Sequence, residues 1–212
     1  MTKERRQQIV DAAARIFNEQ GFHRASMAEI AAAVGMLKGS LYYYFQSKDE
    51  LLFEVILTPL QKLVDALEAV GGSDLPATEA VRQAIRRHVV MAAEYYPTLA
   101  VIAQERFDFL GEPYRSRIMA LHRRYRQLWL DLLRRGAAEG HLRGDLDPSL
   151  ATFAILGMCN WMHRWYRPEG PASAEAIADT FASLVLQGLQ ASDAAPGPAT
   201  DGQGRRADQS HP

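Results

Sequence analysis

The chain has 212 residues, 48% of them hydrophobic, and a formal net charge of −1. This length suits one or two domains, and the apolar content is sufficient for a sizeable buried core. A single cysteine, Cys159, excludes an intramolecular disulfide and fits a reducing compartment. The sequence has no apolar run long enough to span a membrane and no signal-peptide core near its start, so we expect a cytoplasmic protein with no membrane partner.

Apolar residues recur at helical spacing along the chain, without strand signals or internal repeats. We therefore expect an all-α protein of about nine helices. The first helix is predicted over residues 3–20, where an apolar stripe faces inward and Gly21 ends the pattern.

The next stretch predicts two short helices. Ser26 and Glu29 form a capping box that opens the first of them, and Gly35 ends it. After a short turn, the second carries Leu41 and Phe45 on one side. Two short helices joined by a glycine-containing turn are typical of a helix-turn-helix, whose second helix fits the DNA major groove.

The other side of this second helix has side chains suited to DNA. Tyrosine offers a hydroxyl to phosphate and a ring to sugar or thymine methyl, lysine adds positive charge, and glycine allows close approach of the backbone. An alternative is that some of the tyrosines belong to the core of the bundle. We predict DNA contacts from Ser26, Lys38, Gly39, Ser40, Tyr42, Tyr43, Tyr44 and Lys48.

The first fifty residues have seven Lys/Arg and six Asp/Glu, so this segment lacks a strongly basic character. Affinity for DNA would then depend on a few specific side-chain contacts, which a dimer would make twice. The total charge neither supports nor excludes a nucleic-acid partner.

A set of spaced residues runs through the same segment: Ile30, Ala31, Gly35, Gly39, Ser40, Leu41, Tyr42, Tyr44, Phe45, Lys48 and Leu51. With these residues, Ile9 to Leu52 resembles the DNA-binding domain of the TetR family of bacterial transcriptional regulators. Leu37 departs from the family pattern, which usually has a serine or threonine that caps the recognition helix. The resemblance implies a homodimeric, non-enzymatic regulator that binds double-stranded operator DNA, without a cofactor or metal.

A long helix over residues 48–70 should connect the DNA-binding head to a separate body, with a kink or break at Pro59. Asp147 is the predicted N-cap of a later helix that has Pro148 at its first position. The body helices are predicted over residues 76–95, 98–106, 113–135, 148–166 and 173–190. The expected domains are a helix-turn-helix domain at 1–50, a ligand-binding and dimerisation domain at 51–190, and a disordered tail at 191–212.

The last two predicted helices are apolar on more than one face, so one side needs a partner or a ligand. In the TetR family these helices form a four-helix interface with the second copy, which the resemblance implies here. The alternative is a fully internal helix in a monomer. The expected interface residues are Phe153, Leu156, Ile177, Phe181, Leu184, Val185 and Gly188.

Aromatic, methionine and arginine side chains gather in two stretches of the body, as a cavity for an apolar effector would require. The stretch 111–143 alone has eight arginines and three acidic residues, an excess that could hold a phosphorylated group such as coenzyme A or could be a solvated helix face. Core packing is the alternative role of the apolar side chains. The predicted ligand residues are Arg106, Phe107, Phe109, Met119, Arg123, Arg126, Trp129, Met158, Trp161, Met162 and Trp165.

The ending WMHRWYRPEGP, followed by SAEAIAD, resembles the branch of the family whose repressors of fatty-acid, steroid and phenylacetate breakdown release DNA on binding acyl-coenzyme A. This implies an acyl-CoA effector. A regulator of drug efflux with a promiscuous cavity is an alternative within the same fold. A remote alternative is a helical enzyme that uses Cys159 with His163 and His122, because Cys159 and His163 would share a helix face.

Overall fold

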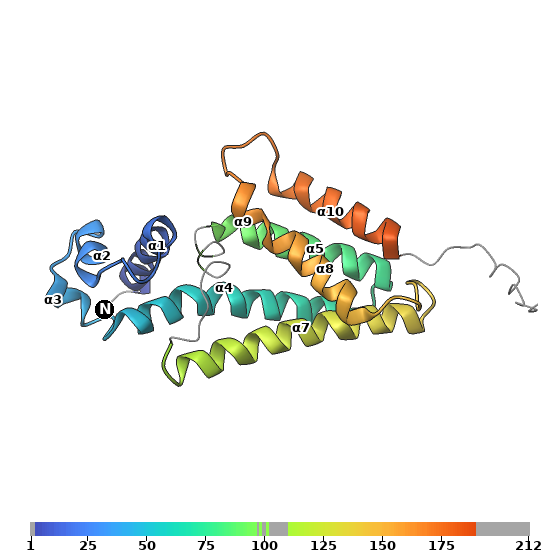
Figure 1. The fold of residues 1–212 in the computed structure, drawn as a ribbon, viewed down its shortest axis with the longest axis horizontal. Helices are drawn as coiled ribbons and strands as arrows, with labels where there is room; N and C mark the ends of the chain where they lie inside the picture. The colour runs from blue at the N-terminus through green and yellow to red at the C-terminus, as the bar shows by residue number, and fades with distance from the viewer. Residues whose placement is uncertain (1–2, 97, 99–100, 102–109, 190–212) are drawn as a thin grey trace, which may run out of the picture.

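A computed structural model describes residues 3–96, 98, 101 and 110–189, and these residues confirm the all-α fold. Three helices form a head at one end of the long helix α4, and the remaining helices surround the rest of α4 (Figure 1). The head helices are α1 (Lys3–Gln20), α2 (Met27–Ala33) and α3 (Lys38–Leu41). The others are α4 (Lys48–Gly71), α5 (Ala77–Glu94), α7 (Tyr114–Ala138), α8 (Pro148–Asn160), α9 (Met162–Trp165) and α10 (Ala174–Leu189).

The predicted helix starts in the head are confirmed by their hydrogen bonds. The Ser26 hydroxyl accepts from the backbone N–H of Glu29, whose carboxylate in turn accepts from the backbone N–H of Ser26. Ser47 caps α4 in the same way through the N–H of Glu50. The Glu50 carboxylate accepts from the N–H of Gln46 rather than from that of Ser47, so the reciprocal bond reaches one residue before the N-cap.

The recognition helix α3 is shorter than the sequence pattern predicted. Its N-cap, Leu37, makes no side-chain cap, and after Leu41 the backbone tightens into bonds of three-residue spacing, from Tyr43 N–H to Ser40 O and from Tyr44 N–H to Leu41 O. Leu41 and Phe45 are nevertheless fully buried, so the predicted inward side of this segment is confirmed.

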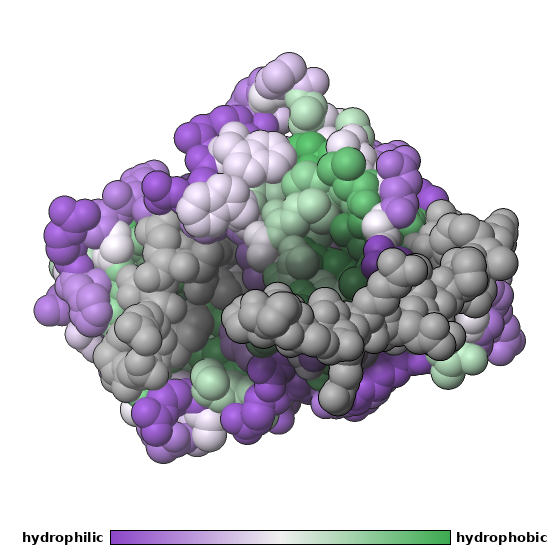
Figure 2. Space-filling model, turned by 45° about the vertical axis from the view of Figure 1, so that its right-hand side comes forward, coloured by the Kyte–Doolittle hydropathy of each residue, from purple (hydrophilic) through white to green (hydrophobic). Residues whose placement is uncertain are grey.

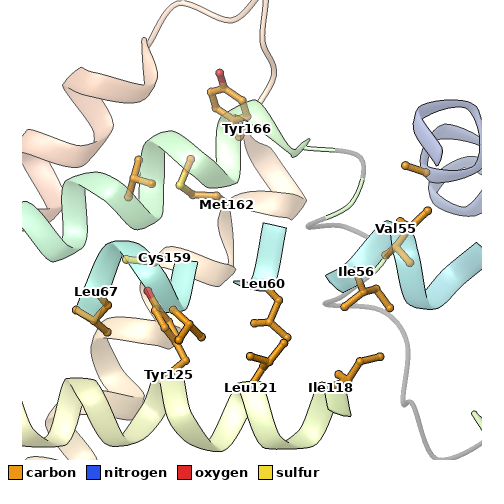
Figure 3. Packing of buried hydrophobic residues seen from close by; sticks show 14 of the residues in the cluster. Val55, Ile56, Leu60, Leu67, Ile118, Leu121, Tyr125, Cys159, Met162 and Tyr166 are labelled. Atoms are coloured by element: carbon orange, nitrogen blue, oxygen red, sulfur yellow. The ribbon is translucent and has the colours of Figure 1, made fainter. Parts of the chain in front are cut away.

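Helix α4 continues through Pro59, so of the kink or break predicted there the break is wrong. Its buried side packs against α1 near the head and against α5 and α7 along the body (Figure 1). In Figure 3, Leu60 of α4 points toward Leu121 of α7. These buried neighbours hold α4 in place on both sides of the proline, which compensates for the hydrogen bond that a proline cannot donate.

The predicted helix over 148–166 is divided into two. Asp147 caps α8 by accepting from the N–H groups of Ser149 and Leu150, as predicted. The α-helical ladder then stops at Asn160, and the N–H of Arg164 bonds to Trp161 O with a three-residue spacing. The short helix α9 follows before the loop that leads to α10.

Some predictions fall on parts of the chain outside the described residues. They are most of the helix at 98–106, the ligand residues Arg106, Phe107 and Phe109, and the tail at 191–212. Within the described part of the chain, no helix combines the length and apolar character needed to cross a membrane.

Candidate nucleic-acid interface and effector pocket

The outer side of the recognition segment is exposed. Tyr43 has a relative accessibility of 79% and Tyr42 of 43%, although tyrosine rings are more often covered. Lys38 and Gly39 are also exposed, and Ser40 is half-buried. Since Leu41 and Phe45 occupy the core beneath them, these side chains face away from the head, where a DNA groove can be reached.

Three of the predicted DNA contacts have structural roles in the head. The Lys48 ammonium lies 2.8 Å from the carbonyl oxygens of Phe22 and Ala25 and 3.2 Å from that of His23. Because these acceptors match the three N–H donors of the lysine, the expected phosphate contact of Lys48 is corrected to a bridge within the head. Tyr44 is half-buried against the core, and the Ser26 hydroxyl is used in the capping box.

Arg6 joins the head to α4. Its guanidinium bonds to the Glu54 carboxylate at 2.8 Å and lies 4.5 Å from the centre of the Phe45 ring. The ion pair raises the pKa of Arg6, so this contact is charged at any physiological pH. A single side chain therefore contacts the end of the recognition segment and the helix that leads into the body.

The body contains a pocket of about 440 Å³ between α4, α5, α7 and α8. Apolar side chains form part of its wall, and two histidines, a tyrosine, an asparagine and two arginines add polar groups to it, which is the mixture typical of small-molecule sites. Among the described residues, the lining consists of Leu60, Leu63, His88, Met119, His122, Arg123, Tyr125, Arg126, Leu156 and Asn160.

A hydrogen-bonded relay crosses one wall of this pocket. His88 Nδ1 lies 2.9 Å from the Tyr125 hydroxyl, and His88 Nε2 lies 3.1 Å from Asn160 Oδ1. Burial lowers the pKa of His88 to about 4 and raises the pKa of the Tyr125 hydroxyl well above its ordinary value. Both groups are therefore neutral near pH 7, and the relay links α5, α7 and α8 through hydrogen bonds alone.

We expect the buried imidazole to make the fold sensitive to mild acid. The folded pKa of His88 is below its unfolded value of 6.5, so the unfolded chain binds more protons and stability falls as the pH decreases through this window. The contribution lost between pH 7 and pH 5 is about 2 kcal/mol. Urea unfolding of wild type and His88→Gln at both pH values tests this, with the exposed His141→Gln as the control variant. A similar pH dependence in His88→Gln and wild type would contradict it.

The arginines of α7 and the following loop differ in their ion pairs. Those that pair with a carboxylate are Arg115, Arg124, Arg134, Arg135 and Arg143. Arg117, Arg123 and Arg126 form no ion pair within the described part of the chain. Since Arg123 and Arg126 both line the pocket, its mouth has positive charge that no carboxylate of the described residues balances.

A second apolar area lies on the face formed by α8 and α10 (Figure 2). A groove of about 470 Å³ runs between these helices, and Leu150 and Leu184, which line it, are 68% and 60% exposed. A contiguous exposed patch of large apolar residues is unusual for a monomer and indicates a protein interface.

Two family models match the chain. The model of the tetracyclin repressor-like C-terminal domain covers residues 74–189, and that of bacterial regulatory proteins of the tetR family covers residues 9–55. The chain belongs to the TetR family of transcriptional regulators.

Relatives of known structure or function span nearly the whole chain. The transcriptional repressor KstR2 of Rhodococcus jostii is 31% identical over 194 residues, which cover 87% of this chain and 91% of that protein. The structure of the ketosteroid regulator KstR2 of Mycobacterium tuberculosis aligns with a TM-score of 0.84 at 27% identity, covering 91% of this chain and 98% of that one. AibR, in a complex with isovaleryl coenzyme A and operator DNA, aligns with a TM-score of 0.74 at 26% identity, covering 86% and 98%.

The structure of this TetR-family chain brings together only some of the predicted ligand residues. Met119, Arg123 and Arg126 line the pocket. Trp129 and Met162 are fully buried in the core, because each belongs to the inward side of its helix. Met158 lines the α8–α10 groove, and Trp161 and Trp165 are exposed outside the pocket, since the helix ends at Asn160 and turns these rings outward.

Sequence reasoning missed His88, Tyr125 and Asn160 as pocket residues. The one available signal was a histidine within the apolar stripe of α5, between Ile85 and Val89. Such a residue is either exposed or bonded to a buried partner, and the sequence does not indicate which.

The structure places only some of the predicted interface residues on the α8–α10 face. Leu184 and Gly188 are exposed and Val185 is half-buried in the α8–α10 groove, and Phe181 is half-buried on α10. Phe153 is exposed on α8 with its ring 5.9 Å from the Arg126 guanidinium, and Leu156 lines the pocket rather than the groove. Ile177 is only 6% exposed and packs within its own chain, so its assignment to the interface is corrected. It lies on the side of α10 that faces α5, the helix against which α10 packs most extensively.

The arrangement required by the enzyme alternative is absent from the described residues. Cys159 is fully buried, and burial raises the pKa of its thiol to about 12, so the nucleophilic thiolate does not form near pH 7. Cys159 lies in α8 and His163 in α9, so the single helix assumed for this pair is divided between them. The His163 imidazole instead lies 2.8 Å from the backbone oxygen of Asn160.

Proposed function

We propose that this protein is a homodimeric repressor, acting in the cytoplasm, that leaves a palindromic operator when an acyl-CoA thioester occupies the pocket between α4, α5, α7 and α8. The observation that supports this most directly is an apolar wall next to two arginines, Arg123 and Arg126, that pair with no carboxylate of the described residues. Residues 1–50 would form the DNA-binding domain, and residues 51–190 the domain for ligand binding and dimerisation.

The chemistry of the pocket suits such a ligand. An acyl chain removes apolar area from water against Leu60, Leu63 and Met119, at about 25 cal/mol per Å². Guanidinium groups match the planar oxygen pairs of phosphate, of which coenzyme A has several. The names of the relatives agree with this class of effector, because KstR2 is a ketosteroid regulator and AibR was crystallised with isovaleryl coenzyme A.

Signal transfer to DNA would follow the contacts of α4 and α7. The ring of Tyr114, at the start of α7, lies 4.9 Å from that of Phe53 in α4, and Glu54 next to it is paired with Arg6 of the head. Because α4 is continuous through Pro59, a ligand that displaces α7 would tilt α4 as one unit. The recognition helices of the dimer, about 34–36 Å apart on DNA, would then leave their successive major grooves.

The ligand must prefer the conformation that does not fit DNA, since only a difference in affinity shifts the equilibrium. Acyl-CoA would therefore lower the affinity for operator DNA, and operator DNA would lower the affinity for acyl-CoA by the same factor. A hydrophobic drug, the effector expected of an efflux regulator, would not require the two arginines.

Calorimetric titration with palmitoyl-CoA tests the effector. We expect wild type to bind palmitoyl-CoA, and we expect Arg123→Gln/Arg126→Gln to bind it about 100-fold or more weakly, because each charged hydrogen bond contributes about 1.5–3 kcal/mol and the variant loses two. Arg117→Gln is the matched control, since Arg117 is also exposed on α7 and forms no ion pair with the residues that the structure describes, but does not line the pocket. Absence of heat with palmitoyl-CoA, together with binding of a hydrophobic cationic dye such as ethidium, would favour the efflux alternative.

A further inference from the structure

The relay His88–Tyr125–Asn160 fixes the orientation of an amide at the pocket wall. The side-chain oxygen of Asn160 can only accept a hydrogen bond, so the imidazole proton of His88 is on Nε2 and is donated to it. His88 Nδ1 then accepts from the Tyr125 hydroxyl. With its oxygen held by His88, the amide of Asn160 is not free to rotate.

The other half of the same amide is open to the pocket, because Asn160 is exposed. Among the described residues, no acceptor bonds to Nδ2 of Asn160, although this residue lines the pocket. The backbone of Asn160 is also held, because its carbonyl oxygen contacts the His163 imidazole at 2.8 Å. The wall therefore presents an oriented N–H donor, and a donor enclosed by a ligand needs an acceptor.

We propose that the Asn160 amide donates a hydrogen bond to the carbonyl oxygen of the effector's thioester, and that the relay selects ligands with this oxygen. The inference rests on the proposed acyl-CoA effector and adds the group that distinguishes a thioester from other coenzyme A conjugates. Arg123 and Arg126 recognise the charge of the ligand, whereas Asn160 recognises the junction between its charged and apolar parts.

The buried relay makes the donor insensitive to pH near neutrality. Since burial keeps His88 neutral, the Nε2–H bond to Asn160 persists and the amide keeps one orientation. Tyr125 is a positioning residue in this scheme, because it acts on the amide only through the imidazole. Donors that are oriented before binding lose little entropy when the ligand arrives, so a single hydrogen bond discriminates well.

The test compares two ligands that differ in one oxygen, palmitoyl-CoA and the thioether S-hexadecyl-CoA, which lacks the carbonyl. We expect wild type to prefer the thioester by roughly tenfold. Asn160→Leu, close in size but without a donor, should bind the two ligands with equal affinity. Tyr125→Phe should reduce the preference only in part, because the amide remains but its orientation is less restricted.

Each variant is judged by the ratio of its two affinities, which does not depend on the fraction of folded protein in the preparation. Equal affinity of wild type for both ligands, or an unchanged preference in Asn160→Leu, would overturn the inference and leave the proposed effector standing. Failure of wild type to bind either ligand would overturn the proposed effector and the inference together.

Discussion

The Tyr43→Ala variant should bind operator DNA about 100-fold more weakly than wild type, because a charge-assisted hydrogen bond to phosphate contributes about 1.5–3 kcal/mol and the dimer loses one at each half-site. Tyr43 is 79% exposed on the outer side of the recognition segment, so its removal deletes contact area without opening a cavity. Fluorescence anisotropy at fixed salt, with a duplex selected by the wild type from a random library, measures the loss.

Two controls separate DNA contact from damage to the fold. Tyr43→Phe keeps the ring and removes the hydroxyl, so its affinity should lie between those of wild type and Tyr43→Ala. The thermal unfolding midpoint and the sedimenting mass of Tyr43→Ala should match those of wild type, since the side chain is outside the core. Unaltered affinity of Tyr43→Ala for the selected duplex would contradict the predicted DNA contact of Tyr43.

The Leu184→Glu variant should be monomeric at concentrations where wild type is dimeric, and its operator binding should be lost with the dimer. Leu184 is 60% exposed on the α8–α10 face, where pairing with a second copy would bury it. A carboxylate buried there without a partner costs several kcal/mol, and the two-fold symmetry applies that cost twice. Sedimentation velocity measures the change in mass.

The matched control makes the same substitution at an exposed leucine in the head. Leu37 is 81% exposed in the head, far along the chain from the α8–α10 face, so Leu37→Glu should keep the dimer mass. It should still weaken DNA binding, because it adds negative charge at the start of the recognition helix. A wild-type mass for Leu184→Glu would contradict the proposed interface.

Local sequence signals predicted most of the helices. Ser26, Ser47 and Asp147 each cap a helix with their own side chains, and the partner N–H groups lie two or three residues away. Interactions of this range are encoded in short segments and depend little on the remainder of the chain. Local signals also predicted the inner side of the recognition segment, because helical spacing places Leu41 and Phe45 on the same side.

Local sequence signals did not predict the contacts between residues far apart in the chain. Lys48 reads from the sequence as one of two lysines flanking a tyrosine run, yet its ammonium is bonded to carbonyl groups more than twenty residues earlier. The pocket relay is similar, since Tyr125 and Asn160 lie 37 and 72 residues from His88. Apolar periodicity also gave no means of separating Trp129 and Met162, which fill the core, from Met119, which lines the pocket.

The sequence by itself determined that this protein is an all-α member of the TetR family, with a recognition segment that has Leu41 and Phe45 on its inner side and tyrosines on its outer side. Those features depend on neighbours within a few turns of helix, where the side-chain order fixes the geometry. Only the tertiary structure decided which polar groups meet: the carbonyl groups around Lys48, the carboxylate of Glu54 beside Arg6, and the relay from Tyr125 to Asn160. Such pairs form because helices pack at particular angles and buried donors must find acceptors, and neither condition can be evaluated from one segment alone.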